Sequence, residues 1–270
     1  CEKLVKEGYK EVTLLGQNVD SYLWYGGGAK KDFSKASNQN KKTAVNFASL
    51  LDKVAQISPE LRIRFSTSNP QDISIEVIKT MAAHKNICDS IHLPVQSGSD
   101  KILKLMNRGY NRKQYLTLID NIKEHLPNCG ISMDIITGFC SETEEDHLQT
   151  LSLMDYVKYD YGYMFKYSER PNTPAQRTMK DNVPDGTKQR RLSEIIDKQR
   201  EHSLYNMKKQ IGETYEVLIE SLSKKSNKHF FGRNSQNHSV VFEKGNAKIG
   251  DYVMVKIQDC TSATLIGTIN

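Results

Sequence analysis

Cysteines are few and widely spaced in this sequence. Five occur among 270 residues, at positions 1, 88, 129, 140 and 260, and none forms a CxxC or a comparable cluster spacing. An odd count at such spacings argues against a disulfide framework and favours free or buried thiols in a reducing cytoplasm. Cys129 and Cys140 flank one expected strand at opposite ends, which argues against a metal shared between them.

Long apolar runs are missing too. No stretch approaches the ~20 consecutive apolar residues that a membrane-spanning helix needs. The first residues have neither the apolar region nor the cleavage site of a signal peptide. Charged residues make up 26% and hydrophobic residues 37% of the chain, which is typical of a soluble globular protein. We therefore expect a cytoplasmic protein without a membrane partner.

Self-contained catalytic motifs are absent as well. Ser97 lacks the context of a nucleophile elbow, so a serine hydrolase is not indicated. His84, His125 and His147 fall on expected helices without the paired spacing of metal ligands. No residue set of the sequence therefore supplies self-contained catalysis.

What the sequence does contain is an alternation of strands and helices. Five β-rich runs, "EVTLLGQNV", "RIRFS", "SIHLPV", "ISMDIITGF" and "YGYMFKYS", alternate with segments of helical periodicity. Asn46 is a plausible helix N-cap, and Asn111 with Gln114 resembles a capping box. Residues 26–42 are rich in Gly, Lys, Ser and Asn and are expected to be a mobile loop. The alternation predicts an α/β fold, a parallel βα barrel over residues 1–186.

The C-terminal third has a different character. Residues 187–211 form a basic, amphipathic helix that connects to five short β-like runs over residues 212–270, which predict a small all-β barrel. Of a net charge of +6, most lies in residues 176–234, which hold 13 Lys and Arg against 8 Asp and Glu. This basic segment is either a nucleic-acid footprint or a solvated helix face. The small barrel also carries stacking groups beside a cation, which suits RNA bases, although at least one Phe is expected in the core. These RNA candidates are Phe230, Phe231, Arg233 and Asn234.

Each of the five expected strands ends in small or polar residues. The carboxyl ends of parallel strands meet at one edge, where ligands of βα folds bind, so five polar ends predict a polar ligand. Asp134, inside an apolar strand, either accepts hydrogen bonds from ligand hydroxyls or is a satisfied structural carboxylate. Arg108 could clamp a carboxylate. The strand ends are Gly16 to Asn18, Ser66 to Ser68 with Thr67, Gln96 to Gly98, Thr137 with Gly138, and Tyr167 to Arg170.

Several of these blocks together resemble a known family. "VTLLGQNVDSY", "FSTSNPQD", "IHLPVQSGSDKILKLMNRGY", "MDIITGFCSETEEDH" and "YSERPNTPAQR" look like consecutive blocks of the radical-SAM methylthiotransferases, most closely of those that act on tRNA. The last 59 or so residues resemble a TRAM domain, an RNA-binding β-barrel. The resemblance implies 2-methylthiolation of N6-isopentenyladenosine at position 37 of tRNA, with S-adenosylmethionine and two [4Fe-4S] clusters as cofactors.

The resemblance also implies roles for individual residues. The methionine moiety of S-adenosylmethionine would lie at Gln17 and Asn18, and its carboxylate at Arg108. The remaining candidates for this cofactor are Ser66, Gln96, Ser97, Asp134, Gly138 and Tyr167. Ser168 and Arg170 would approach the substrate base, together with the RNA candidates of the small barrel.

The chain departs from the family's pattern in one respect. The CxxxCxxC motif that holds the first cluster is absent, and no metal ligand is assigned. We therefore expect a partial barrel without its first strand, a fragment of a longer protein that cannot cleave S-adenosylmethionine alone and is monomeric. Two alternatives stay open: a relative that modifies a ribosomal protein, and a non-catalytic RNA-binding module.

Overall fold

The N-terminal part of the chain is an open, parallel α/β sheet. The computed structural model describes residues 1–66 and 68–270, so Thr67 of the predicted strand end lies outside the described residues. β1 (Glu11–Leu14) pairs with β4 (Arg62–Phe65), and β5 (Ser90–His92), β6 (Gly130–Thr137) and β7 (Tyr161–Lys166) pair in that order, all in parallel. A parallel bridge between Ile63 and Ile87 joins the two groups of strands. The five predicted strands are confirmed.

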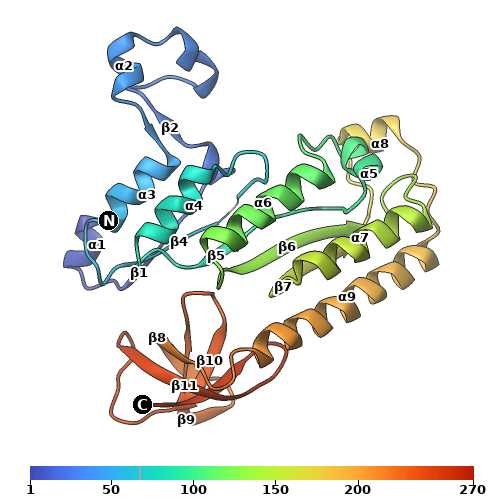
Figure 1. Cartoon of the computed structure of the whole chain (residues 1–270). Helices are drawn as coiled ribbons and strands as arrows, with labels where there is room; N and C mark the ends of the chain where they lie inside the picture. Colours follow the sequence, from blue (N-terminus) through green and yellow to red (C-terminus); the bar gives the residue numbers. More distant parts are fainter. Residues whose placement is uncertain (67) are drawn as a thin grey trace.

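Helices follow the strands and cover one face of this sheet (Figure 1). α3 (Phe47–Ala55), α4 (Ile75–Ala83), α5 (Asp100–Leu105), α6 (Arg112–His125) and α7 (Glu144–Val157) alternate with the strands along the chain. Short helices lie at the N-terminus, α1 (Glu2–Lys6), and after β7, α8 (Pro174–Thr178). Asn46 caps α3, and Asn111 and Gln114 form a full capping box on α6, as the sequence predicts. The main core lies between these helices and the sheet, and its fully buried members include Leu51, Ile63, Ile78, Ile91, Ile119, Met133 and Leu153.

The opposite face of the sheet is partly open to solvent. Side chains of a strand alternate between its two faces, and on β7 this places Tyr163 and Phe165 outside the core, 56% and 55% exposed. Asp134 and Ile136 on β6 are the lateral neighbours of these two rings and are half-buried. We call this open face the concave face of the sheet.

An arm is inserted between β1 and α3. After a short 3-10 helix, η1 (Val19–Ser21), β2 (Leu23–Trp24) and β3 (Val45–Asn46) form an antiparallel stem. The stem carries η2 (Lys30–Lys35) and α2 (Asn38–Lys42) and projects from the rest of the molecule (Figure 1). The prediction of a mobile loop over residues 26–42 is therefore wrong in part, because buried Tyr25 stacks edge-on against Phe33 and gives this segment a small core.

The C-terminal part is a closed five-stranded barrel, as predicted. Its strands are β8 (Thr214–Ser223), β9 (Ser226–Arg233), β10 (Ser239–Glu243), β11 (Tyr252–Cys260) and β12 (Leu265–Ile269), which close in the order β10-β12-β11-β8-β9. α9 (Asp185–Lys208) begins beside the first turn of α7, where Arg190 pairs with Glu144, and runs along α7 to this barrel (Figure 1). Ile195 of α9 is fully buried in the core of the α/β part, so this helix packs on the sheet as well as connecting the two parts.

The connection from β9 to β10 closes the amino-terminal end of the sheet. Arg62 donates to the carbonyl oxygen of Arg233 at 2.6 Å, and Arg64 donates to that of Asn234 at 2.8 Å. The backbone N–H of Asp89, just before β5, donates to the hydroxyl of Ser235 at 2.9 Å. The barrel is thereby fixed at one end of the strands, and the carboxyl ends of the strands, where a ligand is expected, lie at the other.

Candidate functional site at the carboxyl ends of the strands

The strand ends form a continuous edge. The N–H of Ser66 donates to the carbonyl oxygen of Leu14 at 3.2 Å, and the N–H of Tyr167 donates to that of Thr137 at 2.8 Å. Gln96 forms an isolated parallel bridge with Ile135. Neighbouring strands thus extend their pairing by a residue or more into the polar ends, and this brings the predicted polar groups onto one edge of the sheet.

A cavity of about 660 Å³ opens at the ends of β6 and β7. Its walls are mostly apolar side chains from β7 and from the ends of α5 and α8, among them Phe165 and the residues just after the two helices, Met106 and Met179. Four of the predicted site residues line it together: Arg108, Tyr167, Ser168 and Arg170. An apolar pocket with two guanidinium groups at its rim suits a planar ring that is attached to a carboxylate or a phosphate.

Tyr167 is the most constrained member of this group. Its ring stacks edge-on against Phe139 at 4.8 Å, and the ammonium group of Lys188 lies 5.3 Å from the ring centroid. Burial, followed by the thiol of Cys140, raises the pKa of Tyr167 to about 12. The phenol therefore stays protonated at neutral pH and can donate a hydrogen bond.

Other predicted residues lie elsewhere on the edge. Asn18 donates through Nδ2 to Asp72 at 2.6 Å, while its Oδ1 is buried and has no partner among the described residues. The hydroxyl oxygen of Thr137 is also buried and has no hydrogen-bond partner among the described residues. Gln17 is exposed and Ser66 is half-buried. Unsatisfied buried oxygens are costly unless a ligand completes them, so the edge fits a polar ligand with hydrogen-bond donors.

Asp134 lies on the concave face of the sheet, two residues before Ile136, which lines the cavity, and is not itself part of the cavity wall. Its Oδ1 lies 3.4 Å from Nε2 of His92, whose Nδ1 is 2.9 Å from the hydroxyl of Ser132. The carboxylate is 27% exposed, so it is partnered within the protein and still accessible from the concave face. Both interpretations of Asp134 that the sequence left open are compatible with this geometry.

Three of the predicted cofactor-binding residues are buried or closely packed within the protein. Ser97 is fully buried and its hydroxyl accepts the N–H of Ser99 at 3.2 Å. Gln96 is 7% exposed and adopts a left-handed backbone with φ of 67°. At Gly138, φ is 73° and an added Cβ would lie 2.4 Å from Cγ of Lys188, so the small size of the glycine admits that lysine.

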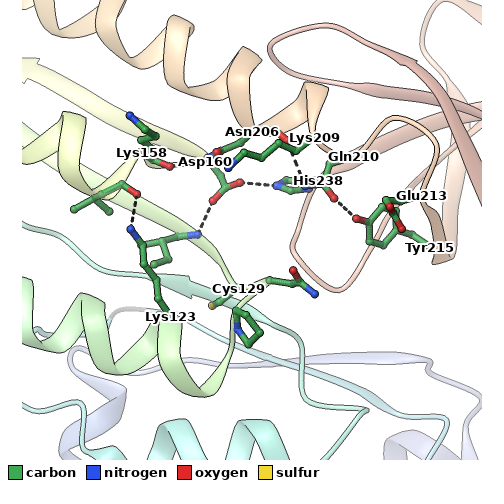
Figure 2. Close-up of a pocket in the computed structure, with 14 residues that line it drawn as sticks. Lys123, Cys129, Lys158, Asp160, Asn206, Lys209, Gln210, Glu213, Tyr215 and His238 are labelled. Carbon is green, nitrogen blue, oxygen red and sulfur yellow. Dashed lines mark hydrogen bonds and ion pairs between the residues drawn. The ribbon is translucent and has the colours of Figure 1, made fainter.

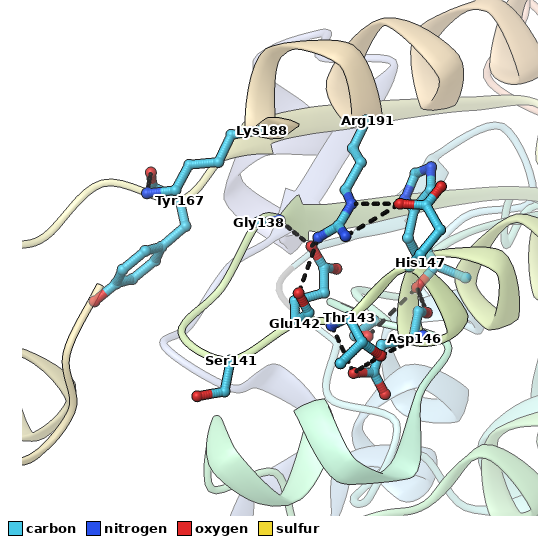
Figure 3. Close-up of polar contacts among 12 residues, drawn as sticks. Gly138, Ser141, Glu142, Thr143, Asp146, His147, Tyr167, Lys188 and Arg191 are labelled. Carbon is cyan, nitrogen blue, oxygen red and sulfur yellow. Dashed lines mark hydrogen bonds and ion pairs between the residues drawn. The ribbon is translucent and has the colours of Figure 1, made fainter. Parts of the chain in front are cut away.

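A polar network behind the strand ends holds this geometry (Figure 3). The carboxylate of Glu142, which is 1% exposed, accepts the N–H of Gly138 and a hydrogen bond from Arg191 at 3.0 Å. Burial raises the pKa of Glu142, and Arg191 opposes this shift. Lys188, three residues before Arg191 on the same face of α9, reaches the carbonyl oxygen of Tyr167 at 3.4 Å. α9 therefore fixes the loops that follow both β6 and β7.

Lys188 and Arg191 are residues that the sequence analysis missed. The basic residues of α9 predicted an exposed face, either RNA-binding or solvated. In the structure the side chains of Lys188 and Arg191 are almost fully buried, 6% and 5% exposed. One signal in the sequence could have indicated this burial. Lys188 and Arg191 are three residues apart in a helix, and the first turn of α7 supplies acidic partners. Arg190 is also neutralised, by Glu144 at 2.6 Å. Much of the predicted basic footprint over residues 176–234 is therefore used within the protein.

The RNA candidates of the small barrel separate into two groups. Phe230 is 5% exposed in the core of the barrel, and Asn234 is fully buried at the contact with the sheet. Arg233 pairs with Glu11 at 2.9 Å and with Glu220 at 2.5 Å. Phe231 is half-buried and points away from the core that Phe230 fills. Among these four residues, Phe231 alone offers an accessible ring.

A second cavity, of about 620 Å³, lies at the amino-terminal end of the strands (Figure 2). Lys123, Lys158 and Lys209 line it, and burial lowers the pKa of Lys123, with the two other lysines adding to this effect. On one wall His238 lies 2.9 Å from Asp160, which also accepts the N–H of Ile131. This cavity belongs to the contact between the two parts of the chain and is remote from the strand-end edge.

The described residues do not fit an iron–sulfur cluster. All five cysteines are free thiols, in line with the sequence analysis, and no group of three or more potential metal ligands is found within residues 1–66 and 68–270. Burial raises the pKa of the thiols of Cys88, to about 11, and of Cys129. In the same part of the chain no helix has the length and apolar character to cross a membrane.

Comparison with known proteins agrees with this architecture. The radical SAM superfamily matches residues 1–154, and the TRAM domain matches residues 208–269. The chain therefore belongs to the radical SAM superfamily and carries a TRAM domain. Members of this superfamily use S-adenosylmethionine and an iron–sulfur cluster.

Over nearly its whole length the chain is similar to proteins named tRNA-2-methylthio-N(6)-dimethylallyladenosine synthase. It is 66% identical to that of Christiangramia forsetii over 98% of this chain and 55% of the relative, and 59% identical to that of Flavobacterium psychrophilum with the same coverage. It is 54% identical to that of Karelsulcia muelleri over 100% of this chain and 59% of the relative. The chain thus spans little more than half the length of the curated relatives it matches.

Proposed function

We propose that this chain is the part of a tRNA methylthiotransferase that binds S-adenosylmethionine and tRNA, acting in the 2-methylthiolation of N6-dimethylallyladenosine at position 37. The observation that supports this most is the 66% identity to a relative of that name, joined to a cavity at the strand ends that four predicted site residues line. The TRAM domain at the other end of the strands supports tRNA as the substrate.

S-adenosylmethionine would lie along the strand-end edge. The guanidinium of Arg108 would bind its carboxylate, and Asn18, Ser66 and Asp134 would accept hydrogen bonds from its polar groups. When bound there, this cofactor would supply the radical chemistry of the superfamily, and these residues would hold and orient it. Ser168 and Arg170 would orient the substrate base at the mouth of the cavity. Gln17, being exposed, remains a candidate on the same edge.

The whole protein would also hold two [4Fe-4S] clusters, whose ligands are not among residues 1–66 and 68–270 of this chain. We propose in addition that the protein acts in the cytoplasm and that this chain is monomeric.

The experiment is a nucleoside analysis of tRNA from a strain in which the gene is deleted. We expect loss of 2-methylthio-N6-dimethylallyladenosine and accumulation of its precursor without the methylthio group, as measured by mass spectrometry. An unchanged tRNA pattern, with loss of a methylthio group from a ribosomal protein, would overturn the proposal in favour of the alternative target. Absence of tRNA binding by the chain at low salt would exclude both RNA-based hypotheses.

A further inference from the structure

The arm between β1 and α3 is built as a defined unit. Tyr25 is 5% exposed, its ring centroid lies 5.2 Å from that of Phe33, and its hydroxyl donates to the carbonyl oxygen of Ala29 at 2.8 Å. Lys41 donates to the carbonyl oxygen of Ser34 at 2.7 Å, which ties α2 to η2. These contacts hold the tip of the arm together without help from the sheet.

The arm carries a strong excess of positive charge. Residues 22–46 contain five lysines and one aspartate, and all five lysines are exposed. Lys30 lies 3.7 Å from Asp72 at the base of the arm. Within the described part of the chain, Lys31, Lys35 and Lys42 have no carboxylate partner. Three uncompensated ammonium groups on one projecting unit fit a polyanion.

The stem of the arm exposes aromatic rings beside this charge. Trp24 is 51% exposed and Tyr22 is 39% exposed. Leu15, just after β1, is 72% exposed and extends the apolar surface toward the sheet. Aromatic rings next to lysines form the pattern that binds single-stranded nucleic acid, because bases stack on the rings while the cations contact the phosphates.

The arm is joined to the candidate site through one carboxylate. Asp72 accepts a hydrogen bond from Asn18 at 2.6 Å and lies 3.7 Å from Lys30 of the arm. The arm therefore starts at the strand-end edge, and it projects from the end of the sheet opposite to the TRAM barrel (Figure 1).

We infer that the arm, residues 22–46, is a second RNA-binding element, which holds an unpaired stretch of the tRNA at the β1 side of the strand-end edge, across the sheet from the cavity. This inference rests on the proposed function and adds a contact to it. Trp24 and Tyr22 provide the stacking surface, and Lys31, Lys35 and Lys42 contact the backbone phosphates. The TRAM domain and the arm then bind the RNA at opposite ends of the strands.

The test uses the fluorescence of Trp24, which is the single tryptophan of the sequence. Titration of the 270-residue chain with a tRNA anticodon stem-loop should quench this emission, because a stacked base contacts the indole. A random-coil polyglutamate at equal charge should not quench it. Equal quenching by polyglutamate, or a change of emission with protein concentration in the absence of RNA, would overturn the inference in favour of general anion binding or self-association.

Charge variants provide the second measurement. Lys31→Gln, Lys35→Gln and Lys42→Gln combined should weaken binding of the stem-loop at least tenfold at low salt. They should also reduce the slope of log K against log salt by about 2, since each contact to a single strand contributes about 0.7. The matched control, Lys53→Gln, Lys79→Gln and Lys85→Gln, removes the same charge from exposed positions on and after the covering helices α3 and α4 and should leave the Trp24 quenching intact.

The two proposals fail in different ways. If the unaltered chain binds tRNA and the arm variant binds as tightly as the control variant, the arm inference is wrong and the proposed function stands. If the unaltered chain does not bind tRNA at low salt, the proposed function itself fails. A second variant, Trp24→Ala, tests the stacking role even if the lysine variant does not fold. It should weaken RNA binding about tenfold, as measured by the anisotropy of labelled RNA, and unchanged binding would exclude the stacking role.

Discussion

Arg64 donates from Nη2 to the carbonyl oxygen of Asn234 at 2.8 Å, across 170 residues of sequence. The same side chain is 7% exposed and pairs through Nε with Glu11 at 2.9 Å. The third nitrogen of the guanidinium, Nη1 of Arg64, donates to the carbonyl oxygen of Ser235 at 3.3 Å. A single guanidinium thus satisfies two backbone carbonyls of the TRAM barrel and one carboxylate of β1, which fixes the barrel on the sheet.

Removal of Arg64 should therefore loosen the contact between the two parts. We expect Arg64→Ala to lower the free energy of unfolding by about 3 kcal/mol, because the half-buried carboxylate of Glu11 and two carbonyls each lose one donor. Urea denaturation followed by circular dichroism measures this change. Arg200→Ala is the matched control: Arg200 is 72% exposed beside Asp197, and its loss should cost less than about 0.5 kcal/mol. Equal effects of the two variants would show that the guanidinium of Arg64 does not stabilise the contact.

Gly138 offers a test of how α9 supports the strand ends. An alanine there must hold a φ of 73°, and its Cβ would lie 2.4 Å from Cγ of Lys188. We expect Gly138→Ala to destabilise the protein by about 2 kcal/mol and to weaken binding of S-adenosylmethionine, since the loop after β6 must shift. Thermal denaturation and calorimetric titration measure the two effects.

The control for this variant lies in the first turn of α9. Gly186 has ordinary helical dihedrals, and no atom lies within 4 Å of an added Cβ. Gly186→Ala should be neutral or should stabilise the helix by up to about 1 kcal/mol. If Gly138→Ala is as harmless as this control, Lys188 can move without cost and the close packing is not needed for stability.

Local patterns in the sequence predicted most of the fold. The alternation in "RIRFS" indicated a strand, and the spacing of Asn111 and Gln114 predicted the start of α6, because strand alternation and helix caps depend on neighbours in sequence. The same alternation places Arg62 and Arg64 on one face of β4. It does not reveal that the loop after β9 covers that face, since this contact joins residues about 170 positions apart.

The candidate site was predictable only in part, for a related reason. Strand ends were found because parallel strands must end at a common edge. Which polar side chains face a ligand depends on their partners, and the sequence does not reveal that the hydroxyl of Ser97 accepts the N–H of Ser99 or that Lys188 packs on Gly138. The sequence indicated polar groups at the edge, and only the packing of α9 and α7 shows which of them remain accessible.

Asp20 gives the fold a pH dependence that can be measured. The side chain is 8% exposed, and burial raises its pKa from 3.8 to about 6, although Oδ2 accepts the N–H of Asn69 at 3.1 Å. Because the folded protein retains this proton to a higher pH than the unfolded chain, its stabilising contribution is complete below pH 4 and is lost as the pH rises to 6.

Asp20→Asn should remove this dependence. The amide keeps an acceptor for Asn69 and cannot ionise, so the stability of the variant relative to the unaltered protein should increase by up to about 3 kcal/mol between pH 4 and pH 6. Urea denaturation of both proteins at pH 4, 5, 6 and 7 measures this difference. If the free energies of unfolding of the two proteins change with pH in the same way across that range, the carboxyl group of Asp20 has the same pKa in the folded and the unfolded protein.

Phe231 and Arg233, two residues apart on β9, should behave in opposite ways toward tRNA. The ring of Phe231 is accessible, so Phe231→Ala should weaken binding by about 1–3 kcal/mol, the usual contribution of one stacked base. Arg233 is paired with Glu11 and Glu220, so Arg233→Ala should leave the salt dependence of binding unchanged while it lowers stability. Anisotropy of labelled tRNA over a salt series, with denaturation of each variant, measures both.

Phe230→Ala is the control that separates stacking from folding. Phe230 lies in the barrel core, so this variant should lose about 3–5 kcal/mol of stability, whereas Phe231→Ala should lose far less. A drop of about one in the salt slope for Arg233→Ala would show that its guanidinium leaves the two carboxylates to contact a phosphate. In that case the barrel would bind RNA through the edge that now contacts the sheet, and the fixed placement of the barrel would have to change when tRNA binds.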